Sequence, residues 1–380
     1  MRKYLLVLVG LMPVFLVGQS QSETRPITVA VPFVNFAPDS RGSALGDAAV
    51  ASSPDVYSIH WNASKLAFIE EDMAFSFSYS PWLGNIVDDM SLNYLTFHRR
   101  LDATQTIGAS LRYFDMGEIF LRDAAGVDQG VENPREMAVD AAYARKLTEN
   151  FSLGVTGRFI WSNLTGNLAN AQGARAGTSI AVDVGAYYRR PFMLSGRNSE
   201  IAFGLNISNI GQKISYSTED NEDFIPGNLR LGTAFTTSLD AFNTITVLFD
   251  VNKLLVPTPP ELDQNGNIVN GEDPNRTLLS GTFGSFTDAP GGFSEELKEI
   301  TLSTGIEYWY KDIFAARAGY FYEHEDKGDR KYFTAGIGFR YQVFGVDFSY
   351  LIPQVQNHPL GDTLRLSFIF SLDKDGPEPN

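Results

Sequence analysis

The sequence predicts an all-β fold: a closed, antiparallel transmembrane β-barrel of about fourteen strands, with an N-terminal segment plugging its lumen. Two patterns predict it. From Met73 to Leu372, stretch after stretch alternates apolar and polar residues, and because strand side chains alternate faces, each stretch has one apolar face and one polar or small face. The connections between stretches alternate short and long, as in barrels with turns on one side of a membrane and loops on the other.

The last stretch, RLSFIFSL, shows the alternation: one face carries Leu366, Phe368, Phe370 and Leu372, and the other carries Arg365, Ser367, Ile369 and Ser371. We expect strands to begin near Met73, Met90, Gln105, Met137, Phe151, Thr178, Ser199, Asn228, Asn243, Glu299, Ile313, Lys331, Val343 and Asp362. The short connections include LDAT, LTEN, SLDAF and KD, whereas the longest runs from Lys253 to Lys298. This alternation puts both chain ends on the side of the short turns, which is the periplasmic side in bacterial barrels.

The chain also begins like an exported protein. Arg2 and Lys3 precede an apolar core from Tyr4 to Val17, and small or polar residues follow, as in a secretory signal peptide. We therefore expect a signal peptide at residues 1–20, a plug segment at 21–72, the barrel at 73–372 and a periplasmic C-terminal tail at 373–380. Export and the barrel pattern together predict the bacterial outer membrane, with both termini in the periplasm.

Composition excludes several classes of function. The chain has no cysteine, which excludes disulfides, thiolate catalysis and cysteine-ligated metal sites. Its formal net charge of -15 argues against a nucleic-acid partner, because binding such a partner requires positive charge. Much of the negative charge falls in expected connections, at 219–223, 261–273, 294–299 and 323–329, and we interpret these runs as solvated loops.

The expected lumen face carries nearly balanced charge. The strand register places these arginines and acids inside: Arg112, Arg158, Arg230, Arg317, Arg340, Arg365, Asp140, Asp183, Asp250, Glu307 and Asp347. Charges in a lumen need partners or water, so one interpretation is a set of ion pairs that stiffens the wall, and the other is a polar path for a solute. Many inward glycines leave room for a further segment of the chain.

The segment before the first strand, Ile27–Asp72, is the candidate to fill that room. It mixes apolar and polar residues and would be exposed and adhesive if it stayed outside the barrel. Folding it into the barrel mouth buries it. We therefore predict a plug that includes Trp61, Asn62 and Lys65.

Motifs for catalysis and cofactor binding are missing from the sequence. The four histidines lack metal-ligand spacing, and no GxSxG, P-loop or GxGxxG sequence occurs. Glu295 and Glu296 are adjacent acids in a long connection, but nothing in the sequence orients them as a catalytic pair. We therefore predict a protein that is not an enzyme and uses no metal or cofactor.

Two blocks of the sequence resemble a known family. The segment APDSRGSALGDAAVASSPDVYSIHWNASKLAFIEEDM with FSYSPWL at Phe77–Leu83, and the block from Gly284 to Tyr341, are similar to the PorV family of the type IX secretion system. More distantly, GDAAVASSPDVYSIHWNASKLA resembles the N-terminal signature of FadL-type barrels, whose plug lies in a fourteen-strand lumen. That signature usually has a proline after the asparagine, where this chain has Ala63, and the departure weakens any transfer of a hydrophobic-solute channel.

The PorV resemblance implies a role in protein secretion. Members of that family receive secreted cargo through its C-terminal signal domain as it leaves a giant translocon barrel. They pass the cargo to a surface attachment complex that contains a sortase-like protease, and they close the lateral opening of the translocon. The implied partners are therefore the translocon barrel, the cargo, the attachment complex and outer-membrane lipid or lipopolysaccharide.

A cargo shuttle needs an exposed docking surface, and the longest connection is the candidate. Its prolines stiffen the chain, and apolar residues stand among glycines: Leu278, Leu279, Phe283, Phe286 and Phe293. The alternative is that this connection folds back over the barrel as a roof. Trp82 and Leu83, in the first long connection, are either secondary docking residues or part of an aromatic girdle at the membrane surface.

Three functions remain open at this point. The first is the secretion shuttle and translocon partner, and the second is a FadL-like outer-membrane transporter of hydrophobic solutes. The third is a lipid A-modifying enzyme, which would need a nucleophile beside a base. The resemblance favours the first, because a barrel by itself does not separate the first two.

Overall fold

A computed structural model describes residues 24–84, 87, 89–122, 125–164, 175–217, 222–354, 361 and 363–372. The predicted signal peptide, residues 1–20, and the predicted tail, residues 373–380, lie outside the described residues. Within the described ranges, no helix is both long enough and apolar enough to cross a membrane.

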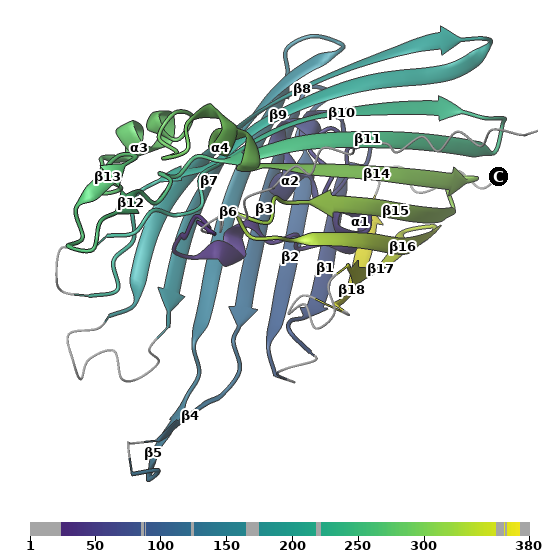
Figure 1. Cartoon of the computed structure of the whole chain (residues 1–380). Helices are drawn as coiled ribbons and strands as arrows, with labels where there is room; N and C mark the ends of the chain where they lie inside the picture. The colour runs from purple at the N-terminus through teal and green to yellow at the C-terminus, as the bar shows by residue number, and fades with distance from the viewer. Residues whose placement is uncertain are drawn as a thin grey trace, which may run out of the picture.

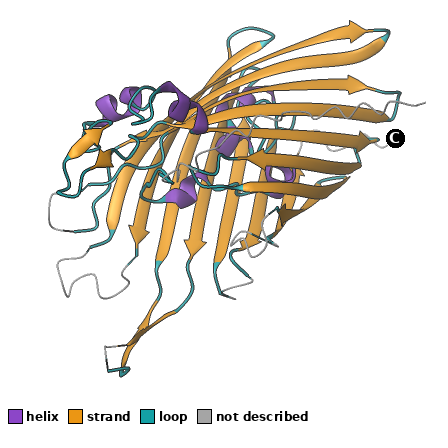
Figure 2. Cartoon of the chain, in the orientation of Figure 1, coloured by secondary structure: helices purple, strands orange, loops and turns teal. Residues whose placement is uncertain are grey.

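The chain folds into one closed antiparallel barrel (Figures 1 and 2). Its wall consists of β1 (Met73–Pro81), β2 (Ser91–Arg100), β3 (Gln105–Asp115), β6 (Arg135–Lys146), β7 (Phe151–Asn163), β8 (Gly177–Leu194), β9 (Arg197–Gly211), β10 (Asn228–Ser238), β11 (Asn243–Leu254), β14 (Ile300–Tyr310), β15 (Phe314–Tyr322), β16 (Lys331–Tyr341), β17 (Phe344–Pro353) and β18 (Leu364–Leu372). β1 pairs with β18 to close the wall, with Phe77 opposite Phe368. The predicted barrel is confirmed, and each strand begins within two residues of its expected start.

Short turns join the strands at one end of the barrel, and longer connections join them at the other. Two long connections carry small hairpins: β4 (Ile119–Arg122) with β5 (Asp128–Glu132), and β12 (Glu261–Leu262) with β13 (Ile268–Asn270). The second of these connections also carries α3 (Leu278–Gly284) and α4 (Phe293–Lys298), which lie at the long-connection end in Figure 1. We call this connection, residues 255–299, the roof loop.

The wall has an apolar outer face and a more polar inner face. In β1, the outward Phe75 and Phe77 are exposed, while the inward Ser76 and Ser78 are buried. The same holds around the barrel, where the exposed outward side chains include Leu95, Val139, Phe159, Val184, Phe249, Ile306, Ile337 and Phe368. A belt of this size fits lipid and not water, because soluble proteins rarely expose so much contiguous apolar surface.

The N-terminal segment fills the lumen as the predicted plug. It contains η1 (Pro32–Asn35), α1 (Ser40–Ala44), α2 (Ser58–Trp61) and η2 (Ala63–Phe68). Inward glycines of the wall make space for it: a Cβ on Gly154 would collide with Ser64, and one on Gly204 would collide with the carbonyl of Val50. The apolar core of the protein therefore lies between plug and wall, where Tyr57 and Leu66 are buried.

The plug runs through the whole lumen, from the long-connection end to the short-turn end. Arg25 donates its backbone N–H to the carbonyl of Asp326 (2.9 Å) and lies 3.6 Å from Glu295, and both of these residues belong to long connections. At the other end, the carbonyl of Asp72 accepts from the backbone N–H of Arg100 (2.8 Å), immediately before β1. The described chain therefore begins and ends at opposite ends of the barrel. The placement of both termini in the periplasm stays a prediction, because residues 1–23 and 373–380 lie outside the described residues.

Candidate functional site

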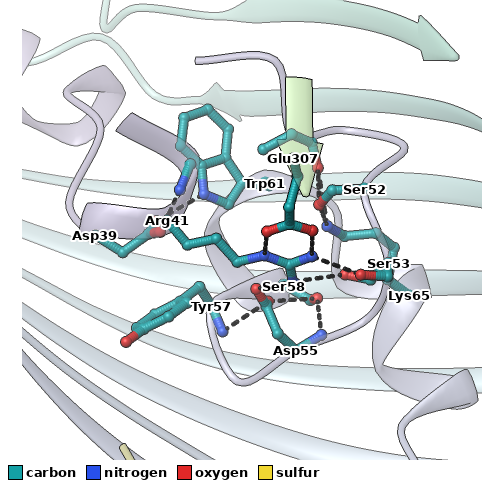
Figure 3. Close-up of polar contacts among 12 residues, drawn as sticks. Asp39, Arg41, Ser52, Ser53, Asp55, Tyr57, Ser58, Trp61, Lys65 and Glu307 are labelled. Carbon is teal, nitrogen blue, oxygen red and sulfur yellow. Dashed lines mark hydrogen bonds and ion pairs between the residues drawn. The ribbon is translucent and has the colours of Figure 1, made fainter. Parts of the chain in front are cut away.

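An arginine of the plug binds a glutamate of the wall (Figure 3). Arg41 on α1 donates from Nε to Oε2 of Glu307 (2.9 Å) and from Nη2 to Oε1 (2.7 Å), which makes a bidentate pair with β14. Its Nη1 also donates to Asp55 Oδ2 of the plug at 2.7 Å. Arg41 and Glu307 are both buried, so water competes little for these charge-assisted bonds. The pair fixes the plug to the wall.

The same pair continues along the wall as a row of alternating charges. Arg317 on β15 binds Glu307 at 2.6 Å and Asp347 at 2.7 Å, and Arg340 binds Asp347 at 2.7 Å. Every charge in this row has an opposite charge beside it, which offsets the cost of burying ions. A separate group on the wall joins three further predicted lumen residues, because Arg158 lies 2.7 Å from Asp140 and 3.1 Å from Asp183.

The remaining arginines of the lumen turn to the plug: Arg112, Arg230 and Arg365. Arg112 donates to the carbonyl of Val34 and Arg365 donates to the hydroxyl of Ser43. The guanidinium of Arg230 lies over the ring of Trp61, 5.1 Å from its centroid. The strand register predicted that these arginines face the lumen. It did not predict their partners, because the partners belong to the plug.

Asp250 holds the plug by a different means. Its Oδ2 accepts from the backbone N–H groups of Ala49 (2.8 Å) and Val50 (2.9 Å), where the plug crosses β11. Buried backbone donors are costly when they are left without an acceptor. A wall carboxylate therefore completes the hydrogen bonding of an irregular stretch of plug.

The three plug residues expected from the sequence all make plug contacts. Trp61 Nε1 donates to Asp39 Oδ1 at 2.7 Å, and Asn62 Nδ2 donates to a carbonyl of β8 at 3.0 Å. Lys65 is buried, and its Nζ donates to two plug oxygens at 2.8 Å each. Burial lowers the pKa of Lys65 to about 8 and raises the pKa of Asp39 to about 6, because the charged form of each group is disfavoured away from water.

The roof loop is fastened to the rim of the barrel by buried ion pairs. Lys253, near the end of β11, binds Glu296 at 2.9 Å and Glu299 at 2.6 Å. Lys327, in the next long connection, binds Glu299 at 3.0 Å and Glu295 at 2.7 Å. The interpretation of residues 294–299 as a solvated run is therefore wrong for Glu296 and Glu299, which are buried because two lysines face them.

The outer side of the roof loop carries exposed apolar side chains. Phe283 and Phe293 are 72% and 77% exposed, and Phe286 is also exposed, whereas Leu278 is half-buried. Leu279 with Phe283 on α3, and Phe293 with Leu297 on α4, are four residues apart, so each helix presents one apolar pair on a single face. The loop thus both covers the barrel and faces outward. We call its exposed set the roof patch: Leu279, Phe283, Phe286, Phe293 and Leu297.

Trp82 and Leu83 do not belong to an exposed surface. The side chain of Trp82 is only 6% exposed, and its ring stacks on Phe36 of the plug with centroids 4.4 Å apart. Leu83 packs partly buried against the same core. Trp82 is therefore neither an exposed docking residue nor part of an aromatic girdle at the membrane surface. The strand alternation that predicted outward side chains stops before this connection, where Leu83 has a positive φ of 52°.

Sequence reasoning missed the plug's own charges. Arg41, Asp39 and Asp55 lie in a segment that was expected to be buried, and buried charges need partners. That requirement could have predicted contacts between plug and wall, because the lumen face of the wall carries both acids and arginines. Among the described residues, no group of three or more His, Asp or Glu side chains is arranged to hold a metal ion.

Known proteins provide a further comparison. The family model described as type IX secretion system protein PorV matches residues 19–261. No curated protein sequence matches the chain. Among solved structures, the chain is similar to the Ralstonia pickettii toluene transporter TbuX, with 13% identity, a TM-score of 0.46 and coverage of 89% of this chain and 98% of that one.

Two other structures are similar at comparable length. The Pseudomonas putida toluene transporter TodX has 11% identity and a TM-score of 0.49, with 92% of this chain and 98% of that one covered. A Pseudomonas aeruginosa FadL homologue has 10% identity and a TM-score of 0.41, with 92% and 98% covered. The family match is the informative one, because it covers more than half of the 380 residues and includes the plug. The chain therefore belongs to the PorV family of type IX secretion system proteins.

Proposed function

We propose that this protein is a cargo carrier in the outer membrane that acts without catalysis. In this proposal it binds secreted proteins by their C-terminal signal domain at the giant translocon barrel, and delivers them to the sortase-like attachment complex. Membership of the PorV family makes it a type IX secretion component, and a closed barrel with an apolar belt fits the bacterial outer membrane. The observation that carries the proposal is the roof patch.

The roof patch has the properties of a docking site for a folded domain. Its aromatic side chains are exposed, and clusters of aromatic anchors supply most of the energy in protein interfaces. The inner side of the same loop is held by Lys253 and Lys327 through buried pairs with glutamates. A surface that is already ordered loses little conformational entropy on binding, so these buried ion pairs favour the binding of cargo.

The anchored plug supports a carrier over a FadL-like transporter of hydrophobic solutes. A transporter needs a plug that moves aside. Here the plug is bound to β14 by Arg41, to β11 by Asp250 and to β18 by Arg365. Moving it would break buried charged contacts on several sides at once, and each is costly to lose.

The proposed orientation puts the roof patch outside the cell. The short turns and residues 373–380 then face the periplasm, and the apolar belt contacts lipid and the lipid part of lipopolysaccharide. In this orientation cargo leaving the translocon meets the roof patch directly.

Affinity purification from detergent-solubilised outer membranes, with a tag on residues 373–380, tests the proposal. The unmodified chain should recover a very large barrel together with secreted proteins that share a C-terminal domain. Phe283→Ser combined with Phe293→Ser should still recover the large barrel but recover at least about tenfold less cargo, because two exposed anchors are lost. Phe120→Ser is the control, since Phe120 is 64% exposed on β4, away from the roof patch.

Two results would count against the carrier. If the double variant recovered as much cargo as Phe120→Ser, the roof patch would not be the cargo-binding surface. Recovery of this protein alone, loaded with lipid or fatty acid and without cargo in any variant, would favour the transporter.

A further inference from the structure

A groove of about 450 Å³ crosses the outer face of the wall over β8–β11. Its lining is mostly apolar and aromatic, and none of the lining residues belongs to the plug. Phe203 and Phe249, which line it, are among the exposed outward side chains of the apolar belt. The groove therefore faces lipid and is separate from the lumen, from the roof patch and from the contacts of the plug.

Two successive rows of outward side chains border the groove. Strand register places side by side, in the row nearer the short turns, Phe151, Tyr188, Phe203, Thr233 and Phe249, and in the next row Ala186, Leu205, Leu231 and Val251. Successive outward residues on one strand are about 7 Å apart, so the backbone at Gly204 and Gly232 forms a floor between the rows. Ala186 and Thr233 are smaller than the rings beside them, which deepens the groove at these positions.

An exposed arginine lies beside one end of the groove. Arg190 lies two residues beyond the part of β8 that lines the groove, on the same outward face. The backbone N–H of Arg189 donates to the carbonyl of Asn150 (2.9 Å), so Arg190 lies level with the polar turn where the apolar belt ends at β7. Glu200 lies 3.9 Å from Arg189, on the lumen side of the wall. Across the described residues, Arg190 forms no ion pair with Glu149 of that turn or with any other acid.

The two ends of the groove differ in charge. Arg145 of β6 is exposed on the outward face and shares a register row with Ala186, so a second cation lies at the same end as Arg190. At the other end, the two rows continue into Leu302 and Thr304 of β14, which are uncharged. A ligand that matches this arrangement carries negative charge at the β6–β8 end and an apolar chain that runs toward β11.

We propose that the groove binds one anionic phospholipid of the surrounding membrane, with an acyl chain between the two rows and the phosphate of its head group beside Arg190. The apolar belt puts the groove in contact with lipid, so its apolar occupant is an acyl chain. An arginine at the edge of this surface attracts anionic head groups, and a charge-assisted contact selects among lipids that share the same chains. The charged end lies at the short turns, which face the phospholipid leaflet in the proposed orientation. The site involves neither the roof patch nor cargo, so it goes beyond the proposed function.

Native mass spectrometry of the full-length protein in detergent tests the proposal, with phosphatidylglycerol as the probe. Phosphatidylglycerol should form a one-to-one complex about fivefold more tightly than phosphatidylcholine with the same acyl chains, because phosphatidylcholine carries no net charge. Arg190→Gln should remove this preference. Arg99→Gln is the matched control and should keep it, because Arg99 is exposed on the outward face of β2, away from the groove.

Ala186→Phe tests the groove without changing its charge. The added ring would fill the space between the rows, and binding of both lipids should weaken by about tenfold. Ala141→Phe, at an exposed outward position of β6 outside the groove, should leave binding unchanged. Equal binding of the two lipids by the unmodified chain, or a preference that persists in Arg190→Gln, would overturn the head-group contact. Unchanged binding in Ala186→Phe would overturn the groove as the site, and tighter binding of lipid A than of phosphatidylglycerol would overturn the choice of a phospholipid.

Discussion

Replacing Arg41 by methionine should loosen the plug and leave the wall intact. The change removes two bonds to Glu307 (2.9 and 2.7 Å) and the pair with Asp55 (2.7 Å). Glu307 keeps Arg317 at 2.6 Å, so it is not left without a cation. We therefore expect the lower end of the cost of breaking a buried ion pair, about 3 kcal/mol. Methionine retains much of the apolar stem of arginine, so the packing term is small.

The assay is hydrogen–deuterium exchange of the folded protein, read over plug residues 39–68. A loss of about 3 kcal/mol makes local opening of the plug roughly 150-fold more frequent, with a matching increase in exchange rate. Arg340→Met is the matched control, because Arg340 binds Asp347 in the same row of charges while its hydrogen bonds go to the wall. Equal plug protection in the two variants would refute the assignment of the Arg41 pair as the anchor.

Two further predictions concern the fit and the charge of the plug. Gly204→Val should lower the free energy of unfolding, measured in urea, by about 1–3 kcal/mol, because the added side chain would collide with the carbonyl of Val50. Gly157→Val is the control and should be nearly neutral, because a Cβ on Gly157 meets nothing within 4 Å. Equal losses would contradict this. Burial raises the pKa of Asp39 to about 6 from 3.8, so its contribution to stability is full below about pH 4 and is lost as the pH rises through 6. Because Trp61 donates to Asp39, tryptophan fluorescence should change with a midpoint near pH 6, and Asp39→Asn should abolish that change.

The barrel was predictable from the sequence because strand alternation acts over a few residues. In the final strand, Arg365 and Ser367 are buried and Phe368 is exposed, as the pattern of that stretch alone requires. Turn spacing is also local, which explains why the strand starts agree so closely with their expected positions. The inward placement of Arg158 and Asp140 followed from the same register.

The contacts of the plug were not predictable, because they join positions far apart in the chain. Arg41 and Glu307 are separated by 266 residues, and no periodicity in either segment indicates the other. The burial of Trp82 depends in the same way on Phe36, which reaches it only because the plug enters from the long-connection end. Glu296 was misjudged for a related reason, since its lysine lies 43 residues away on β11. An amphipathic pattern gives the face of a residue but not its partner.

The path of the plug constrains how the protein is assembled. Residues 24–72 run through the lumen and lead directly into β1, whose pairing with β18 closes the wall. Once that seam has formed, the segment can enter or leave only lengthwise, past strands whose inward glycines already contact it. A plug that lies inside before β1 meets β18 avoids that passage, because β1 and the plug are continuous in the chain.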